Sequence, residues 1–307
     1  RKYLICDLPV IALLYTQNRI FLLRIAHKNK RKAMRLHAIM IVFTLALLNF
    51  SVFSQDVSDI YVEKINTVPD MLQTDREANL PGKGMQYCLP VSVSNSFVWL
   101  SENGFERLME KGIRKKTAQF KVASILGSSE YMNTSLKNGT GTKGLLVGID
   151  KYIRAKGYEY RSLRYQGWRY HPKQYSTGIK IPALKWIKEG MKGKSAVWLN
   201  VGWYRYNKRN DEYLRIGGHW VTLVGYGVDE NGNRDGNVLI VHDPSPRAGR
   251  AFANEYVRLE SINGGRLTGN KKGLPHDAEG YYRLTGGMHI KKRADLGILD
   301  GVVVLKM

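Results

Sequence analysis

Cysteine is almost missing from this sequence. Its 307 residues include two cysteines, Cys6 and Cys88, and only Cys88 lies outside the N-terminal segment that we set apart below. A lone thiol excludes an internal disulfide and a cysteine-rich zinc site in the rest of the chain. Residues 229–236 carry the alternating oxygen side chains of a calcium loop, but Arg234 stands at its glycine position, so we expect a hairpin turn. The histidines lack zinc-ligand spacing, among them His171, His276 and His289. We predict no metal and no other cofactor.

Acidic residues are also scarce. Lysine and arginine number 48 against 26 aspartates and glutamates, which gives a net charge of +22. Residues 1–54 contain nine of the basic residues and one Asp, so residues 55–307 keep 22 − 8 = +14. This excess favours contact with an anionic cell-envelope polymer, although it also serves solubility. No basic block with interleaved aromatics forms a nucleic-acid motif, so we expect no specific nucleic-acid partner.

Long apolar runs are absent as well. The apolar stretch at residues 38–48 is shorter than the ~20 residues that a membrane-spanning helix needs. A short basic region with Met34 and Arg35 precedes it, and Val52-Phe53-Ser54 before Gln55 provides a cleavage site, which is the pattern of a secretory signal peptide over residues 34–54. We interpret residues 1–33 as an upstream or non-native segment, with a membrane anchor as the alternative. The protein is therefore expected to be secreted or periplasmic, with no stable membrane span after cleavage.

The rest of the chain divides into two parts. Residues 55–83 are polar and mixed, and we expect an exposed lead-in. Residues 84–307 are long enough for one domain with a good core, and they contain no internal repeat or low-complexity tract. Apolar residues recur first with the helical period and later with the strand period. Helices are predicted at about residues 88–102, 117–126, 145–157 and 182–190, and strands at 196–206, 219–226, 238–242, 281–284 and 302–305. Helices followed by strands indicate an α+β domain with an antiparallel sheet.

Cys88 falls where the first predicted helix begins, in the run GMQYCLPVSVSNSFVWL. A helix N-terminus favours a thiolate over a thiol, because its free N–H groups and its dipole stabilise negative charge. A cysteine on an apolar helix is more often inert packing than a nucleophile. Other residues must therefore decide what Cys88 does.

A histidine and a carboxylate follow on two neighbouring predicted strands. His219 opens a strand in GGHWVTLVGYG, and Asp243 closes the next one in VLIVHDP. If the turn at residues 229–233 joins these strands as a hairpin, both side chains lie at the same end of the sheet. His219 can then accept the thiol proton while Asp243 holds the imidazole tautomer. The Cys88 backbone N–H and the Gln86 side-chain amide are the local candidates for an oxyanion hole.

These motifs together resemble those of papain-like cysteine peptidases. From Gln86 to Pro244, the chain is similar to the bacterial branch of bacteriocin-processing peptidases: Gln-x-Cys at a helix start, then His-Trp-Val-Thr-Leu-Val-Gly-Tyr-Gly, then a strand ending in Asp-Pro. The resemblance implies a papain-like α+β fold, in which a helical N-terminal half packs its Cys-bearing helix on an antiparallel β-sheet. It also implies that Cys88 is the nucleophile, His219 the base, Asp243 the orienting acid and Gln86 the oxyanion-hole glutamine.

Two positions depart from the family pattern. The oxyanion-hole glutamine usually lies farther before the cysteine, where this chain has Gly82, and the residue after the cysteine is usually glycine, where this chain has Leu89. We expect a secreted thiol hydrolase that cleaves an amide bond in a peptide or protein substrate. A weak or inactive domain of the same kind, which binds a peptide or a cell-envelope polymer, is the first alternative. A cell-wall amidase or transferase is the second.

Other residues near these motifs have competing interpretations. His242 could replace His219, but strand alternation places it and the adjacent Asp243 on opposite faces. Three aromatic residues precede the His219 strand, and they either line a substrate groove or pack the sheet: Trp203, Tyr204 and Tyr206. The sequence leaves these two roles open.

Overall fold

The computed structural model describes residues 60–246, 253–269 and 275–307. All of them belong to one compact unit that begins at Ser58. The predicted signal peptide, residues 34–54, and the segment 1–33 lie outside the described residues. Among the residues that are described, no helix is long and apolar enough to cross a membrane.

The helices come early in the described chain. The four α-helices of these residues are α2 (Cys88–Glu102), α3 (Lys115–Gly127), α4 (Thr142–Ala155) and α5 (Leu184–Met191). Single 3-10 turns are η1 (Arg76–Ala78), η2 (Pro81–Gly84), η3 (Glu106–Leu108) and η4 (Lys173–Tyr175). All four α-helices lie close to their predicted positions, because each has apolar residues at helical spacing.

Within the described ranges, nine strands form one sheet: β1 (Ser162–Gly167), β2 (Ser195–Asn207), β3 (Glu212–Val228), β4 (Arg234–His242), β5 (Glu255–Ser261), β6 (Arg266–Thr268), β7 (His276–Asp277), β8 (Tyr282–Gly286) and β9 (Leu296–Lys306). Six of them close into an antiparallel barrel, in the order β2, β3, β4, β5, β8, β9 and back to β2. Strand β1 extends the sheet from β9, while β6 pairs in parallel with β3 and carries β7.

The expected papain-like α+β fold with a helical N-terminal half is therefore wrong, and the protein is mostly β. The sequence pattern does not reveal β1, β5, β6 and β7, because these strands are short and partly polar. Strand β3 also begins well before His219, among polar residues. Register shifts at Trp203/Tyr204 and Leu223/Gly225 mark bulges that bend the long strands. Such bends allow a twisted sheet to close on itself.

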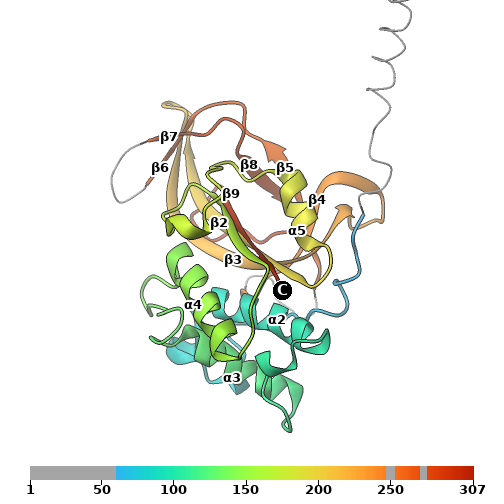
Figure 1. Ribbon diagram of the computed structural model, residues 1–307. Coiled ribbons are helices and arrows are strands. Elements are labelled where there is room, and N and C mark those ends of the chain that lie inside the picture. Colours follow the sequence, from blue (N-terminus) through green and yellow to red (C-terminus); the bar gives the residue numbers. More distant parts are fainter. Residues whose placement is uncertain (1–59, 247–252, 270–274) are drawn as a thin grey trace, which may run out of the picture. The chain divides into compact units, whose positions relative to one another are not determined.

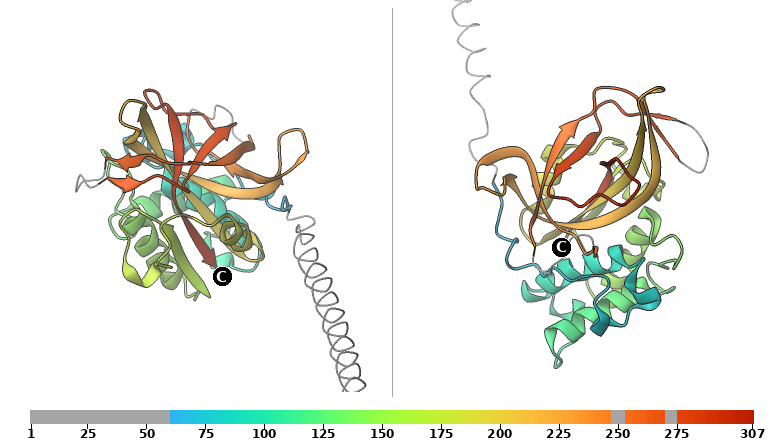
Figure 2. Two further views of the ribbon diagram at one scale, coloured as in Figure 1. Left: turned by 90° about the horizontal axis from the view of Figure 1, so that it is seen from above. Right: turned by 180° about the vertical axis from the view of Figure 1, so that it is seen from behind.

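The two faces of the barrel wall have different neighbours. Alternate residues of β2, such as Val197 and Leu199, belong to one apolar cluster with α5 and with residues of β4, β5 and β9. The residues between them, such as Trp198, belong to a second cluster with α2, α3 and α4. Figure 1 and both views of Figure 2 show α2, α3 and α4 gathered on one side of the barrel. The helix group is thus a layer against the outer wall.

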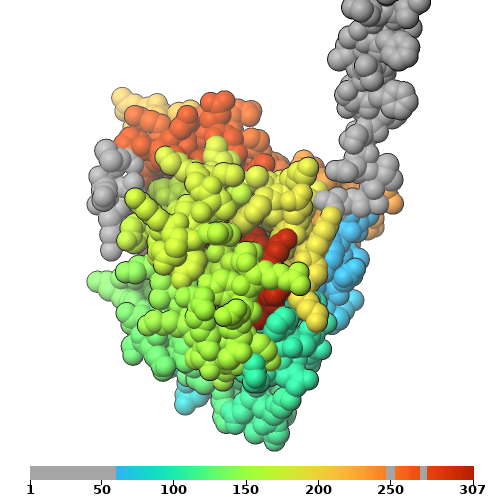
Figure 3. Space-filling view, viewed as in Figure 1, coloured from blue at the N-terminus to red at the C-terminus, as the bar shows by residue number. Residues whose placement is uncertain are grey.

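Strand β9 lies at the centre of this construction. Its residues from Leu296 to Leu305 are buried, and it pairs with β1, β2 and β8. In Figure 3 the end of β9, in dark red, is visible only between surfaces coloured green and yellow.

The expectation of an exposed lead-in at residues 55–83 is not met in its described part, which starts at residue 60. Tyr61 pairs with Tyr226 of β3 through two backbone hydrogen bonds. Lys64 is 2% exposed, and its Nζ donates to the carbonyl oxygens of Met191, Gly193 and Ser195. The segment is polar, but its polar groups have partners in the domain, so polarity does not indicate exposure here.

Candidate active site

Cys88 is the first residue of α2. Ser92 joins the helix to the barrel. Its carbonyl oxygen accepts hydrogen bonds from Trp198 Nε1 (3.1 Å) and Thr222 Oγ1 (2.9 Å). The Ser92 hydroxyl in turn donates to Trp220 O (3.1 Å). Small polar residues on this face therefore let the helix approach β2 and β3 closely, and its N-terminus comes to lie beside His219.

His219 joins the two other predicted members of the site. Its Nε2 lies 2.5 Å from Asp243 Oδ1, and Cys88 lies close enough to its side chain to raise the pKa of His219. Because Nε2 is turned to Asp243, Nδ1 is the nitrogen left for the thiol. His219 is 4% exposed and Asp243 is fully buried. The structure thus brings Cys88, His219 and Asp243 together, with His219 inside β3 rather than at its start.

The ionisation of His219 depends on these neighbours. Burial alone lowers the pKa of His219, because the charged ring loses its hydration. The Asp243 carboxylate opposes this, and Cys88 adds smaller contributions of the same sign as Asp243. The balance raises the pKa of His219 from 6.5 to about 9. The imidazole is therefore protonated at neutral pH, the state that stabilises a neighbouring thiolate.

Asp243 is itself fixed in place. It follows directly after β4, and its Oδ1 also accepts the backbone N–H of Ser245 at 2.8 Å. A carboxylate that accepts several hydrogen bonds cannot turn freely. Asp243 therefore sets the orientation of the His219 ring.

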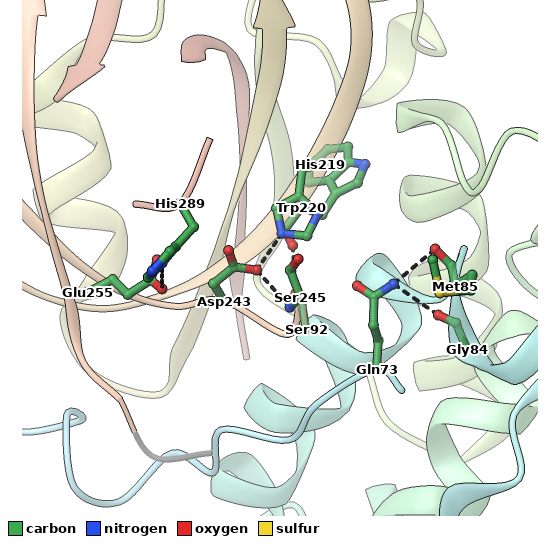
Figure 4. A network of polar contacts seen from close by, with 10 residues as sticks. All are labelled: Gln73, Gly84, Met85, Ser92, His219, Trp220, Asp243, Ser245, Glu255 and His289. Atoms are coloured by element: carbon green, nitrogen blue, oxygen red, sulfur yellow. Dashed lines mark hydrogen bonds and ion pairs between the residues drawn. The ribbon is translucent and has the colours of Figure 1, made fainter. Parts of the chain in front are cut away.

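Gln73, which the sequence analysis did not single out, connects the two sides of the site (Figure 4). Its backbone N–H donates to Pro244 O at 2.7 Å, just after Asp243. Its side-chain Nε2 donates to Gly84 O (2.9 Å) and Met85 O (3.0 Å), in the turn before Cys88. Gln73 therefore holds the turn before Cys88 at a fixed distance from the end of β4.

Gly84 shows how close this approach is. Its φ is +73°, and a Cβ at this position would lie 1.6 Å from the carbonyl oxygen of Gln73. Any side chain would thus collide with the backbone as well as strain the turn. The Gly-Lys-Gly run at residues 82–84 is the one sequence signal that marks this contact, and it points only to a tight turn.

Gln86 has a different environment. It is half-buried, and its Oε1 lies 3.4 Å from the position that a Cβ on Gly139 would take. The neighbouring Thr140 O accepts the indole N–H of Trp220, so the loop beside Gln86 adjoins the residue after His219. Across the described residues, the Gln86 amide makes no hydrogen bond, whereas the Gln73 amide is occupied by two carbonyls. Of these two glutamines, Gln86 is the one with donors left for a ligand.

The competing interpretations of nearby residues are resolved by their contacts. His242 bonds Pro69 O through Nδ1 and Asn254 Oδ1 through Nε2, so it faces away from the thiol. Trp203 and Tyr204 are buried, and Trp203 stacks on His219 with ring centroids 6.0 Å apart. Both therefore pack the sheet, and Trp203 also supports the His219 ring.

The turn at residues 229–233 is a hairpin connection. Asp229 accepts the N–H groups of Asn231 and Asn233, and Asn233 O accepts the N–H of Asp229. The Asp229 carboxylate thus serves the turn itself. In the part of the chain that the structure describes, no group of three or more His, Cys, Asp or Glu residues could hold a metal ion.

Comparison of the whole chain with known protein families and with curated proteins gave no match.

Proposed function

We propose that the protein is a thiol hydrolase that cleaves an amide bond in a peptide. The observation that carries this proposal is the contact of one buried imidazole with both Asp243 and Cys88. The motif resemblance to bacteriocin-processing cysteine peptidases supports the same chemistry. Secretion or a periplasmic location remains part of the proposal and rests on residues 34–54.

The reaction uses the imidazolium–thiolate pair directly. The Cys88 sulfur attacks the carbonyl carbon of the scissile amide, and a C–S bond forms. His219 gives its proton to the leaving nitrogen as the C–N bond breaks, which leaves a thioester on Cys88. A water molecule then attacks the thioester while His219 takes its proton. The carboxylic acid leaves and the imidazolium–thiolate pair is restored, with Asp243 holding the ring throughout.

The developing oxyanion needs donors beside the sulfur. The first N–H groups of a helix have no intrahelical acceptor, so the backbone N–H of Cys88 is available there. The Gln86 amide supplies the second donor if it turns from Gly139 toward the thiol. Removal of one such donor costs about 10²–10³ in kcat, which makes Gln86→Ala the variant that measures its part.

The resting position of Gln86 also favours a second candidate function. With its Oε1 against Gly139, the oxyanion hole is incomplete until the side chain turns. A protein that stays in this state binds a peptide or an anionic envelope polymer and does not cleave it. A reactive Cys88 without turnover of any substrate is the expected behaviour of such a binding module.

Reaction with iodoacetamide at neutral pH tests the nucleophile. The folded full chain should be alkylated at Cys88, and the rate should fall at least about tenfold in His219→Ala, because the imidazolium no longer stabilises the thiolate. Mass spectrometry separates Cys88 from Cys6. His289→Ala is the matched control, since that imidazole bonds Glu255 and does not contact Cys88.

Turnover of a mixed peptide library and of peptidoglycan fragments completes the test. Cleavage of peptides that Cys88→Ser abolishes supports the peptidase. Turnover of peptidoglycan fragments alone would instead indicate a cell-wall amidase or transferase. A Cys88 that reacts only after unfolding is a packed residue, and that result would overturn the proposal.

A further inference from the structure

Two arginines lie near the stretch of β3 that precedes His219, one on β3 itself and one in the segment after β1. Arg215 is on β3 itself, and its Nη2 is 2.3 Å from the position that a Cβ on Gly218 would take. Arg169 follows β1, and its guanidinium carbon lies 4.6 Å from the ring centre of Trp168. Burial lowers the pKa of Arg169, and the charge of Arg215 lowers it further. The two guanidinium groups are thus close enough to repel each other.

Only one carboxylate serves this pair. Asp300, fully buried in β9, accepts Arg215 Nε at 2.6 Å through Oδ2. Its Oδ1 is used by Tyr204 Oη (2.5 Å) and Trp168 Nε1 (3.1 Å). The Arg169 guanidinium hydrogen-bonds no other residue of the described ranges. The cluster therefore holds two positive charges against one negative charge.

Two paired glycines lie beside this cluster. Gly202 and Gly218 face each other across β2 and β3, and Gly218 is exposed. A Cβ on Gly202 would lie 2.6 Å from both carboxylate oxygens of Asp300. The Asp300 carboxylate thus lies directly over Gly202, and the Arg215 guanidinium lies directly over Gly218, the exposed residue before His219. A carboxylate that Arg215 binds would therefore lie close to the backbone of His219.

We propose that Arg169 and Arg215 form a subsite for a substrate carboxylate beside His219. This subsite deepens the proposed function, on which it rests, since it selects amide substrates with a carboxylate near the scissile bond. A planar carboxylate can accept one N–H from each guanidinium and neutralise the surplus charge. An Asp or Glu side chain and a free C-terminus offer the same group.

Binding of small carboxylates tests the subsite without turnover. The full-length Cys88→Ser protein is titrated with glutarate, which represents an acidic side chain, and with N-acetylalanine, which represents a C-terminus. Glutaramide and N-acetylalanine amide are the neutral counterparts, and arginine side-chain ¹⁵N resonances are the readout. We expect shifts with the acids alone, and the tighter of the two identifies the source of the carboxylate.

Two variants locate the binding. Arg169→Gln should weaken carboxylate binding at least about tenfold, and it leaves the Arg215–Asp300 pair intact, so the fold is not at risk. Arg161→Gln removes an exposed arginine just before β1 and should bind as the parent does. Equal binding by Arg169→Gln and the parent would overturn the subsite, as would tighter binding of inorganic phosphate than of either acid.

Matched peptide pairs then connect the subsite to catalysis. One set of pairs exchanges Glu for Gln at positions around the cleaved bond, and a second set compares a free C-terminus with its amide. In at least one pair the acidic peptide should have the higher kcat/KM. This preference should disappear in Arg169→Gln. A preference that survives in Arg169→Gln contradicts the subsite while the peptidase stands. If no peptide is cleaved but carboxylates bind through Arg169, the subsite stands and the peptidase fails.

Discussion

Among the residues that the structure describes, two aspartates are fully buried, and their partners differ in one respect. Asp243 is paired with His219, which can lose its proton, whereas Asp300 is paired with Arg215, which cannot. The first pair can exchange protons at accessible pH, and its neighbour is a thiol. The second keeps a fixed charge beside that site. The same burial of a carboxylate thus occurs once beside a group that can titrate and once beside a group that keeps its charge.

The largest expected effect is the loss of folding stability when the Asp300–Arg215 pair is broken. Asp300→Asn leaves the Arg215 charge without its carboxylate in a buried place, which should lower the free energy of unfolding by about 3–5 kcal/mol. Urea denaturation measures this loss. Asp243→Asn should cost clearly less, because His219 can respond by losing its proton. Equal losses in the two variants would contradict the distinction between the pairs.

The pH dependence of stability should report the titratable pair. The pKa of His219 is raised from 6.5 to about 9 in the folded protein, so the folded state holds its proton more tightly than the unfolded state. The resulting stabilisation is complete below pH 6.5 and is lost as the pH rises through about 9. It amounts to about 3 kcal/mol. Denaturation midpoints across this range should fall in the parent, and this part of the slope should be absent in His219→Gln.

Gln73→Ala should have a smaller effect on stability. It leaves the carbonyl oxygens of Gly84 and Met85 without their shared donor, at a cost of about 1–3 kcal/mol. Because the turn before Cys88 is then free to move, alkylation of Cys88 should slow by more than the loss of stability explains. Gln119→Ala is the control: its amide also bonds a buried group, Asn95 Oδ1 at 2.6 Å, but it lies away from the turn before Cys88. Identical alkylation rates in both variants would show that Gln73 does not position the nucleophile.

The smallest expected effect on stability is that of Gln86→Ala. Its amide has no hydrogen bond among the described residues, so the free energy of unfolding should change by less than about 0.5 kcal/mol. Substrate turnover by Gln86→Ala should nevertheless fall, because the oxyanion loses one of its two proposed donors. A stability loss of the size expected for Gln73→Ala would show that Gln86 is a structural residue.

Local elements of the fold were predictable, whereas their closure was not. The helix of Cys88 and the hairpin between β3 and β4 follow from short-range periodicity and turn chemistry, and these elements carry Cys88, His219 and Asp243. The barrel depends on bulges and on pairing of β2 with β9, which lies far away in sequence. Sequence periodicity contains no information on such distant pairing.

Gln73 and Asp300 show why the rest of the polar network was missed. Gln73 lies in a polar segment without periodicity, and only its distant partners, Gly84 and Pro244, give it a role. Asp300 lies within an apolar strand, in the run Gly-Ile-Leu-Asp-Gly, where a single charge gives no sign of its partner. Both roles are set by contacts that only the folded chain makes.

The central place of β9 also has a consequence for the order of events during synthesis. The ring of six strands cannot close until residues up to Lys306 have left the ribosome, because β9 supplies the last two pairings. Cys88 emerges long before that, and contacts between such distant segments form late because of their loop-closure entropy. Cys88 thus remains without its completed scaffold until β9 has been synthesised. Under the proposed function, this delay would keep the thiol from acting on its own nascent chain while that chain is unfolded.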